Sequence, residues 1–261
     1  MIYIILIIIV ELIFYGLFSI YKNKFKWLIS KSDEFPNYDF KALKKFYKNS
    51  YDFDLGWTRK PNTCGIEKGK NEDIFFNIDR YGSRKSIHNP DEAKIITLGD
   101  SYAFCRQVKD EDTWQNKISN HINSSVLNYG VGNYGIDQAL LRFDKVFIPP
   151  KCKYSILAFV PETISRIQSY WKHYLEFGNT FAFKPRFKLD SNNNLILIKQ
   201  YIDDFNKYKR IKQNKDFIRS NDRFYNDKFK KYYFKFPYTL SFFKNFFFNF
   251  NIFYSLTKNL I

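Results

Sequence analysis

Cysteine is scarce in this sequence, and its pattern excludes several classes of protein. The 261 residues include three cysteines, Cys64, Cys105 and Cys152. An odd number at unrelated spacings provides neither a disulfide framework nor a set of metal ligands, so we expect free thiols. Zinc-finger spacings and the glycine-rich loop that cradles nucleotide phosphates are also missing. The cysteines do not identify the compartment, and no metal is expected.

Acidic residues are outnumbered by basic ones. The chain carries 42 Lys and Arg against 26 Asp and Glu, for a formal net charge of +16. Such a balance can serve binding to nucleic acid or to an anionic membrane surface. Here the basic residues are spread along the chain and most are Lys, whereas Arg is preferred for bidentate contacts to bases and phosphates. We interpret the charge as solvated surface and expect no nucleic-acid partner.

The longest apolar run lies at the N-terminus. Residues Ile2 to Ile20 contain a single charged side chain, Glu11. About 20 apolar residues, at about 1.5 Å each, cross the hydrocarbon core of a bilayer. The basic start and small cleavage-site residues of a signal peptide are missing. We therefore expect a single-pass transmembrane anchor over residues 1–22, with the lipid bilayer as a partner; because the whole chain is rich in Lys, the side of the soluble domain stays open.

Between the anchor and residue 165, the pattern predicts a lead-in followed by an α/β core. Residues 23–94 hold turns and short strands, one of them over residues 74–78. Residues 95–165 alternate short apolar strands, expected at 95–98, 126–128 and 155–160, with two helices. The first helix has Asp112 as its N-cap, Gln115 in a capping box, and an apolar face formed by Trp114, Ile118 and Ile122. The second places Ile136, Leu140, Phe143 and Phe147 on one face. This alternation predicts a parallel sheet covered on both faces, with ligands at the carboxyl ends of its strands.

The alternation of strands and helices does not continue in residues 166–261. There we expect a hairpin and an aromatic-rich helical insertion or lid. Residues 181–187 and 195–198 are candidates for the hairpin. Further on, Lys244, Asn245 and Asn249 interrupt the phenylalanines and argue against a second membrane span. A helix lying against the membrane is one interpretation. We favour an ordinary helix packed on the domain.

The residues that carry chemistry begin with Gly99-Asp100-Ser101, directly after the first core strand. A serine hydroxyl is a weak nucleophile that needs a base to accept its proton. The run from Ile95 to Phe104 resembles the nucleophile block of the SGNH (GDSL-type) hydrolases. The run from Val126 to Gln138 resembles their second block and follows one helix later. The resemblance implies a three-layer α/β/α flavodoxin-like fold and acyl-ester chemistry at Ser101, without a cofactor.

The resemblance also implies an oxyanion hole. Its first donor would be the backbone amide of Ser101, and its second an amide at Asn133, with Gly132 just before it. Asn tolerates the positive φ that such a position needs better than most residues. In the third block, Glu162 occupies the place of the family's Asn side chain. A carboxylate there would repel an oxyanion unless it were protonated or turned away.

Other side chains near these blocks are candidates for substrate contacts. Asp100 precedes the nucleophile, and Thr163 and Arg166 follow the third strand. Either of the last two could replace the missing Asn as a donor.

The fourth block of the family, Asp-x-x-His, is absent. None of His88, His121 and His173 has Asp three residues before it. We interpret all three as structural, and His173 is the preferred candidate among them for a catalytic base. We expect the chain to be a C-terminally incomplete piece of a longer protein. The leading hypothesis is a membrane-anchored SGNH-type serine esterase or O-acyltransferase acting on an acyl ester of a sugar, lipid or polymer. The alternative is a non-catalytic binding or assembly protein on the same scaffold.

Overall fold

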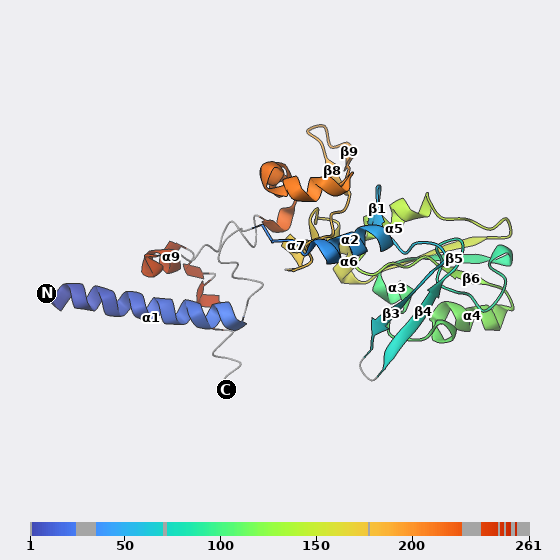
Figure 1. The fold of residues 1–261 in the computed structure, drawn as a ribbon, viewed down its shortest axis with the longest axis horizontal. Coiled ribbons are helices and arrows are strands. Elements are labelled where there is room, and N and C mark those ends of the chain that lie inside the picture. Colours follow the sequence, from blue (N-terminus) through green and yellow to red (C-terminus); the bar gives the residue numbers. More distant parts are fainter. Residues whose placement is uncertain are drawn as a thin grey trace.

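The computed structural model describes residues 2–24, 35–69, 72–176, 178–225, 236–244, 246–247, 249–251 and 254. It is a mixed α/β protein, in which a body of strands and helices follows a long N-terminal helix, α1 (Ile2–Lys24) (Figure 1). The α/β class expected from the sequence is confirmed.

Helix α1 is apolar along most of its length. The segment Ile2–Ile20 is long and apolar enough to cross a membrane, and little of its surface is buried by the rest of the protein. A signal sequence near the N-terminus has the same length and composition. Its large side chains, such as Ile4, Leu6 and Ile7, are exposed in the protein alone.

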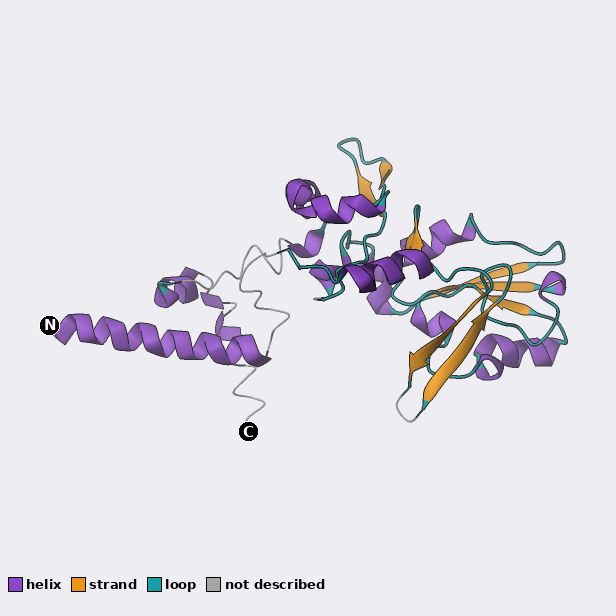
Figure 2. Cartoon of the chain, viewed as in Figure 1, coloured by secondary structure: helices purple, strands orange, loops and turns teal. Residues whose placement is uncertain are grey.

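The centre of the body is a small parallel sheet. Strand β5 (Ile95–Gly99) pairs with β6 (Val126–Asn128) on one side and with β7 (Tyr154–Ala158) on the other, both in parallel (Figure 2). The three strands lie where the sequence predicted them, within one or two residues. Ile96, Leu98 and Leu127 are buried because they lie where the connecting helices cover the sheet.

The two connecting helices differ from expectation in which face they bury. Helix α4 (Trp114–Ile122) has Thr113 as its N-cap instead of Asp112, which lies in the 3-10 turn Asp110–Asp112. Gln115 does not cap the helix. It is buried, and its amide donates to the Thr97 hydroxyl (3.1 Å) and to the Ala103 carbonyl (2.7 Å). The polar face of α4 is therefore the inner one, because it meets hydrogen-bonding groups of the sheet and of the segment that follows β5.

Helix α5 (Ile136–Phe143) also buries its polar face. Leu140 is exposed, whereas the polar residues Asp137, Gln138 and Arg142 are buried. Phe147 lies beyond the end of the helix. The polar side chains reach partners distant in sequence: the Gln138 amide donates to the Leu55 carbonyl (2.7 Å), and Arg142 donates to the Gly82 carbonyl (3.0 Å). Amphipathic periodicity fails here because another part of the chain, and not solvent, covers the polar face.

The lead-in is bonded into this body. It contains α2 (Phe40–Asn49), the pair β1 (Tyr51–Asp52) and β2 (Gly56–Trp57), and the antiparallel hairpin β3 (Thr63–Lys68) and β4 (Asp73–Ile78). The hairpin confirms the strand expected at 74–78. Arg84 forms bridges to both Ile78 and Asn128, so the hairpin continues the parallel sheet beyond β6.

A second hydrophobic core, rich in aromatic residues, forms around the segment after β7. The segment contains α6 (Pro161–Arg166), α7 (Lys172–Leu175), the hairpin β8 (Arg186–Leu189) and β9 (Leu195–Ile198), the 3-10 helix Phe205–Asn214 and α8 (Lys215–Ser220). Buried Tyr170, Trp171 and Phe183 pack here with Leu43 of α2. The expected hairpin is present, but its first strand starts at Arg186, and residues 181–185 form no strand.

The last described helix, α9 (Tyr238–Lys244), corrects a further expectation. It packs against α1, and not on the α/β body. Asn245, also part of that expectation, lies outside the described residues.

The buried ion pair between Lys184 and Asp137 joins the two cores and generates a stability prediction. The Lys184 ammonium lies 2.5 Å from an Asp137 oxygen and also donates to the carbonyls of Pro185 (2.8 Å) and Ser169 (3.3 Å). Lys184→Met leaves a buried carboxylate without its cation, so we expect the free energy of unfolding to fall by about 3 kcal/mol in urea titrations. The control is the double variant Asp137→Asn/Lys184→Met, which should recover at least half of that loss. A loss below about 1 kcal/mol for Lys184→Met would show that the pair does not stabilise the fold.

Candidate active site

Ser101 lies at a sharp turn directly after the central strand. Gly99, the last residue of β5, has φ +147°, and a Cβ there would lie 2.2 Å from the Ala158 carbonyl oxygen, so a side chain is excluded. Asp100 then caps the short helix α3 (Ser101–Phe104) by accepting from the Tyr102 amide (2.9 Å). This places Ser101 in the first turn of α3, half-buried, on the wall of a pocket of about 570 Å³.

The same pocket gathers residues from all three strand ends. Ser101 follows β5, Asn133 follows β6 and Arg166 follows β7, and all three line it. The rest of the wall comes from residues around the end of α3 and the start of α4: Tyr102, Cys105, Arg106, Gln107, Val108, Asp112 and Trp114. The structure thus brings Ser101, Asn133 and Arg166 together, as the parallel topology predicted.

The loop after β6 has the conformation that an amide donor needs. Asn133 has φ +68°, in the left-handed region that Asn tolerates. The Val131 amide donates to the Gly99 carbonyl (3.0 Å), which fixes this loop to the turn before Ser101. Within the part of the chain that the structure describes, the backbone amides of Ser101, Gly132 and Asn133 donate no hydrogen bond. They are therefore available to an oxygen atom of a ligand.

Asp100 and Arg166 form an ion pair under the pocket. Arg166 Nη1 lies 3.1 Å from Asp100 Oδ2 and 3.1 Å from the Tyr134 carbonyl oxygen. Asp100 is almost completely buried, so its carboxylate orients Arg166 and the Tyr102 amide and does not face the pocket. Arg166 uses only Nη1 for these contacts, which leaves Nε and Nη2 without a partner among the described residues.

The other two residues of the third block do not reach the pocket. Glu162 is exposed at the start of α6 and lines neither this pocket nor its neighbour. Thr163 is buried, and its hydroxyl donates to the Val160 carbonyl (2.6 Å). Of the candidates to replace the family's Asn, Arg166 is the one that the structure places beside Ser101.

No histidine lines the pocket among the described residues. His173 is buried in α7, where its Nδ1 accepts from the Gly178 amide (3.2 Å), and burial lowers its pKa to about 4. His121 is exposed late in α4, and His88 is half-buried in the lead-in. Burial raises the pKa of the Cys105 thiol, so this pocket residue is a poor nucleophile. The described residues also contain no cluster of three potential metal ligands.

Sequence reasoning missed Arg84, which supports α3 from below. This buried side chain donates to the carbonyls of Phe104 (2.7 Å), Cys105 (2.8 Å) and Val108 (2.6 Å), and pairs with Asp110 (2.7 Å). It thereby satisfies the carbonyl groups at the end of α3 that have no partner within the helix. The lead-in sequence around Arg84 gives no signal for this role, because the contacts depend on the fold.

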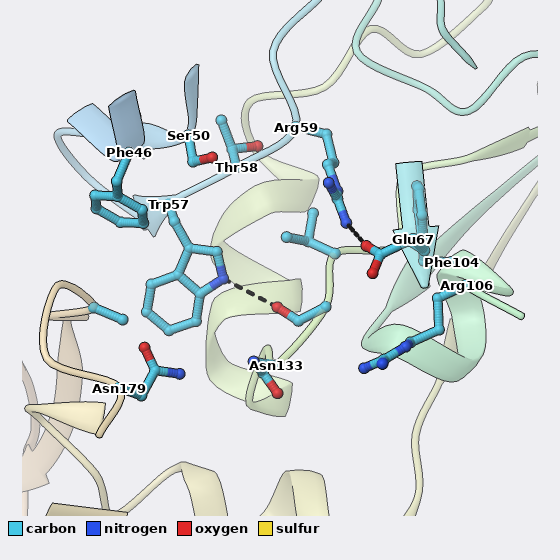
Figure 3. A pocket seen from close by; sticks show the side chains of 13 residues that line it. Phe46, Ser50, Trp57, Thr58, Arg59, Glu67, Phe104, Arg106, Asn133 and Asn179 are labelled. Atoms are coloured by element: carbon cyan, nitrogen blue, oxygen red, sulfur yellow. Dashed lines mark hydrogen bonds and ion pairs between the residues drawn. The ribbon is translucent and has the colours of Figure 1, made fainter. Parts of the chain in front are cut away.

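A second, smaller pocket of about 240 Å³ adjoins the first (Figure 3). Arg106 and Asn133 line both pockets. In Figure 3 the Trp57 ring lies between Phe46 and Asn179, and its Nε1 donates to the Gly132 carbonyl (3.0 Å). Its wall also includes hydroxyls and an ion pair: Ser50, Thr58, and Arg59 with Glu67 at 2.5 Å.

The close approach of the β6 loop to α3 predicts unequal effects of alanine at two neighbouring glycines. A Cβ at Gly130 would lie 2.4 Å from the Phe104 amide nitrogen, whereas a Cβ at Gly132 has no heavy atom within 4 Å. We expect Gly130→Ala to cost about 2 kcal/mol and to lower the melting temperature by several degrees. Gly132→Ala is the matched control and should change stability by less than about 0.5 kcal/mol. Equal melting temperatures by circular dichroism would contradict the packing described here.

The buried imidazole of His173 predicts a pH dependence of stability. As pH falls through about 6.5 the unfolded chain takes up this proton, but the folded protein does so only near pH 4. The contribution is therefore complete above pH 6.5 and is lost as pH falls toward 4. Between pH 7 and pH 5 we expect a loss of about 2 kcal/mol that the variant His173→Gln does not show. Identical pH profiles of the two proteins in urea titrations would contradict it.

Comparison with protein-family models and with curated proteins gave no match to this chain. The interpretation of the site therefore rests on its own geometry and on the resemblance of its two sequence blocks. That geometry is a serine on a sharp turn, two loops with available amides, and an arginine held by a buried aspartate.

Proposed function

We propose that the protein is an SGNH-type serine esterase or O-acyltransferase on a flavodoxin-like scaffold, with Ser101 as its nucleophile. The observation that carries this proposal is the shared pocket of Ser101 and Asn133, whose amides have no other acceptor among the described residues. The Ser101 oxygen gives its proton to a general base and adds to the ester carbonyl carbon, and the carbonyl oxygen becomes an oxyanion. When this intermediate collapses, the bond between the carbonyl carbon and the alcohol oxygen breaks, the alcohol leaves with the proton, and the acyl group stays on Ser101 until water or a second alcohol accepts it. The amides of Ser101 and Asn133, with Gly132 beside them, hold that oxygen, at about 3 kcal/mol for each donor.

Arg166 takes the place of the third donor in this proposal. The family's Asn offers a neutral amide, whereas the guanidinium offers a permanent positive charge beside the developing oxyanion. Asp100 orients Arg166 through the buried ion pair, so the charge is positioned before the ester arrives. Glu162 is turned away and does not oppose the oxyanion.

The adjoining pocket supports a sugar as the alcohol part of the ester. Its wall combines amides, hydroxyls and an ion pair with the Trp57 ring, a mixture that suits a polyol better than a fatty acyl chain. Helix α1 supports attachment to a membrane as a single-pass anchor, since its length and composition suffice to span the hydrocarbon core.

One observation favours a second candidate, a non-catalytic binding or assembly protein. A serine nucleophile requires a base, and no described residue of the pocket is a histidine. Asp112 lines the pocket but is paired with Lys117 at 2.6 Å. On this alternative the same pocket binds an ester or a sugar without turnover.

A fluorophosphonate probe separates the two candidates, because it labels only an activated serine. We expect labelling of the membrane-embedded protein and turnover of p-nitrophenyl acetate, both abolished in Ser101→Ala, with turnover falling by at least about 10³-fold. Ser220→Ala, on an exposed serine of α8, is the matched control. A wild-type protein that is folded but neither labelled nor active would favour the binding protein.

A further inference from the structure

Glu11, the one charged residue of the apolar stretch Ile2–Ile20 of α1, is the point at which a C-terminal segment of the chain docks. The Glu11 carboxylate accepts hydrogen bonds from the backbone amides of Tyr238 (2.6 Å) and Thr239 (3.2 Å), and from the Thr239 hydroxyl. These groups belong to the first turn of α9, which lies beside α1 (Figure 1). A carboxylate in an apolar helix thus has three donors from a segment more than 200 residues away in sequence.

Glu11 lies near the middle of the apolar run. It is nine positions after Ile2 and nine before Ile20, or about 14 Å from either at about 1.5 Å per residue. If α1 crosses a bilayer, the first turn of α9 therefore lies at the depth of the hydrocarbon midplane. At that depth no water can satisfy the carboxylate, so the donors from α9 have to enter the membrane with it.

Aromatic rings extend the contact from Glu11 toward the C-terminal end of α1. The rings of Phe14 and Phe242 have centroids 4.9 Å apart, and those of Tyr15 and Tyr238 are 5.3 Å apart. Phe18 is buried by this packing, whereas most neighbouring side chains of α1 are exposed. The contact is therefore a packed helix interface and not a single hydrogen-bonded point.

The outer face of the docked segment is apolar and uncovered. We define the C-terminal aromatic segment as residues 236–244, 246–247, 249–251 and 254. Its exposed large side chains are Phe236, Leu240, Phe243, Phe246, Phe247, Phe250 and Tyr254. They continue the exposed apolar surface of α1, so a single apolar medium would cover both.

We propose that the C-terminal aromatic segment is itself embedded in the bilayer, with its outer phenylalanines against lipid acyl chains. In this arrangement the segment is docked on α1 through Glu11. The proposal rests on the proposed membrane anchoring of α1. Two of the polar residues that argue against a second span are compatible with this placement, although the buried Asn249 Oδ1 has no partner among the described residues. Asn249 is buried, and its amide donates to the Phe242 carbonyl (2.8 Å). Lys244 carries its charge on a long stem that can reach the headgroup level.

Photocrosslinking tests the proposal in the full chain reconstituted in phosphatidylcholine vesicles. p-Benzoylphenylalanine replaces Phe247, which is 83% exposed, and lipid adducts are located by mass spectrometry. The same probe replaces Tyr3 of α1, also 83% exposed, to report the anchor, and Phe75 of β4, 64% exposed, as the soluble control. We expect adducts on acyl chains at Tyr3 and Phe247 and none at Phe75.

The outcomes separate the segment from the anchor. Adducts at Tyr3 without adducts at Phe247 would overturn the embedded segment and leave the anchor standing, and absence at both positions would overturn both. Glu11→Leu removes the acceptor for α9 and should reduce the Phe247 adducts several-fold, whereas Glu11→Gln keeps an acceptor oxygen and should retain most of them. Equal yields in Glu11→Leu and the wild type would show that Glu11 does not dock the segment.

Discussion

The buried ion pair between Asp100 and Arg166 is the constraint on which the candidate site depends. Asp100 terminates the turn after β5, Arg166 ends the helix after β7, and the same guanidinium nitrogen reaches the loop after β6 through Tyr134. One carboxylate and one guanidinium thereby hold three strand ends at a common pocket. Because Asp100 is nearly inaccessible to water, the interaction is screened little, and the loss of either partner would leave a buried charge.

The lead-in, residues 23–94, stabilises the candidate site through further hydrogen bonds. Arg84 donates hydrogen bonds to the carbonyls at the end of α3. Trp57 both donates to and accepts from residues of the loop after β6. Its Nε1 donates to the Gly132 carbonyl, and its own carbonyl accepts from the Tyr134 hydroxyl (2.6 Å). The segment before the core is therefore part of the site and forms one wall of the second pocket. In the proposed function, that wall meets the alcohol part of the substrate.

The contact between α1 and α9 resembles the site in one respect, that a carboxylate receives hydrogen bonds from a distant segment. Glu11 lies in an apolar helix and Asp100 is buried in the core, and each carboxylate has polar groups brought from a distant segment. In the α/β body these partners fix the geometry of a pocket. In α1 they act together with the aromatic packing to position the C-terminal aromatic segment.

The sequence by itself determined the local elements of this protein. Short apolar runs located β5, β6 and β7, Gly99-Asp100-Ser101 located the turn, and the choice of Asn at position 133 anticipated its positive φ. These features depend on backbone preferences and burial within a few residues, which local patterns express.

Tertiary structure decided which polar side chains are inside. Gln138, Arg142 and Asp137 are buried against partners 47 to 83 residues away, and the docking of α9 on Glu11 spans 227 residues. A periodic pattern assigns polar residues to solvent, since it contains no information about distant donors and acceptors. The inner faces of α4 and α5, the role of Arg84 and the place of α9 all follow from such distant pairs, because a buried polar group is stable only where the fold supplies its partner.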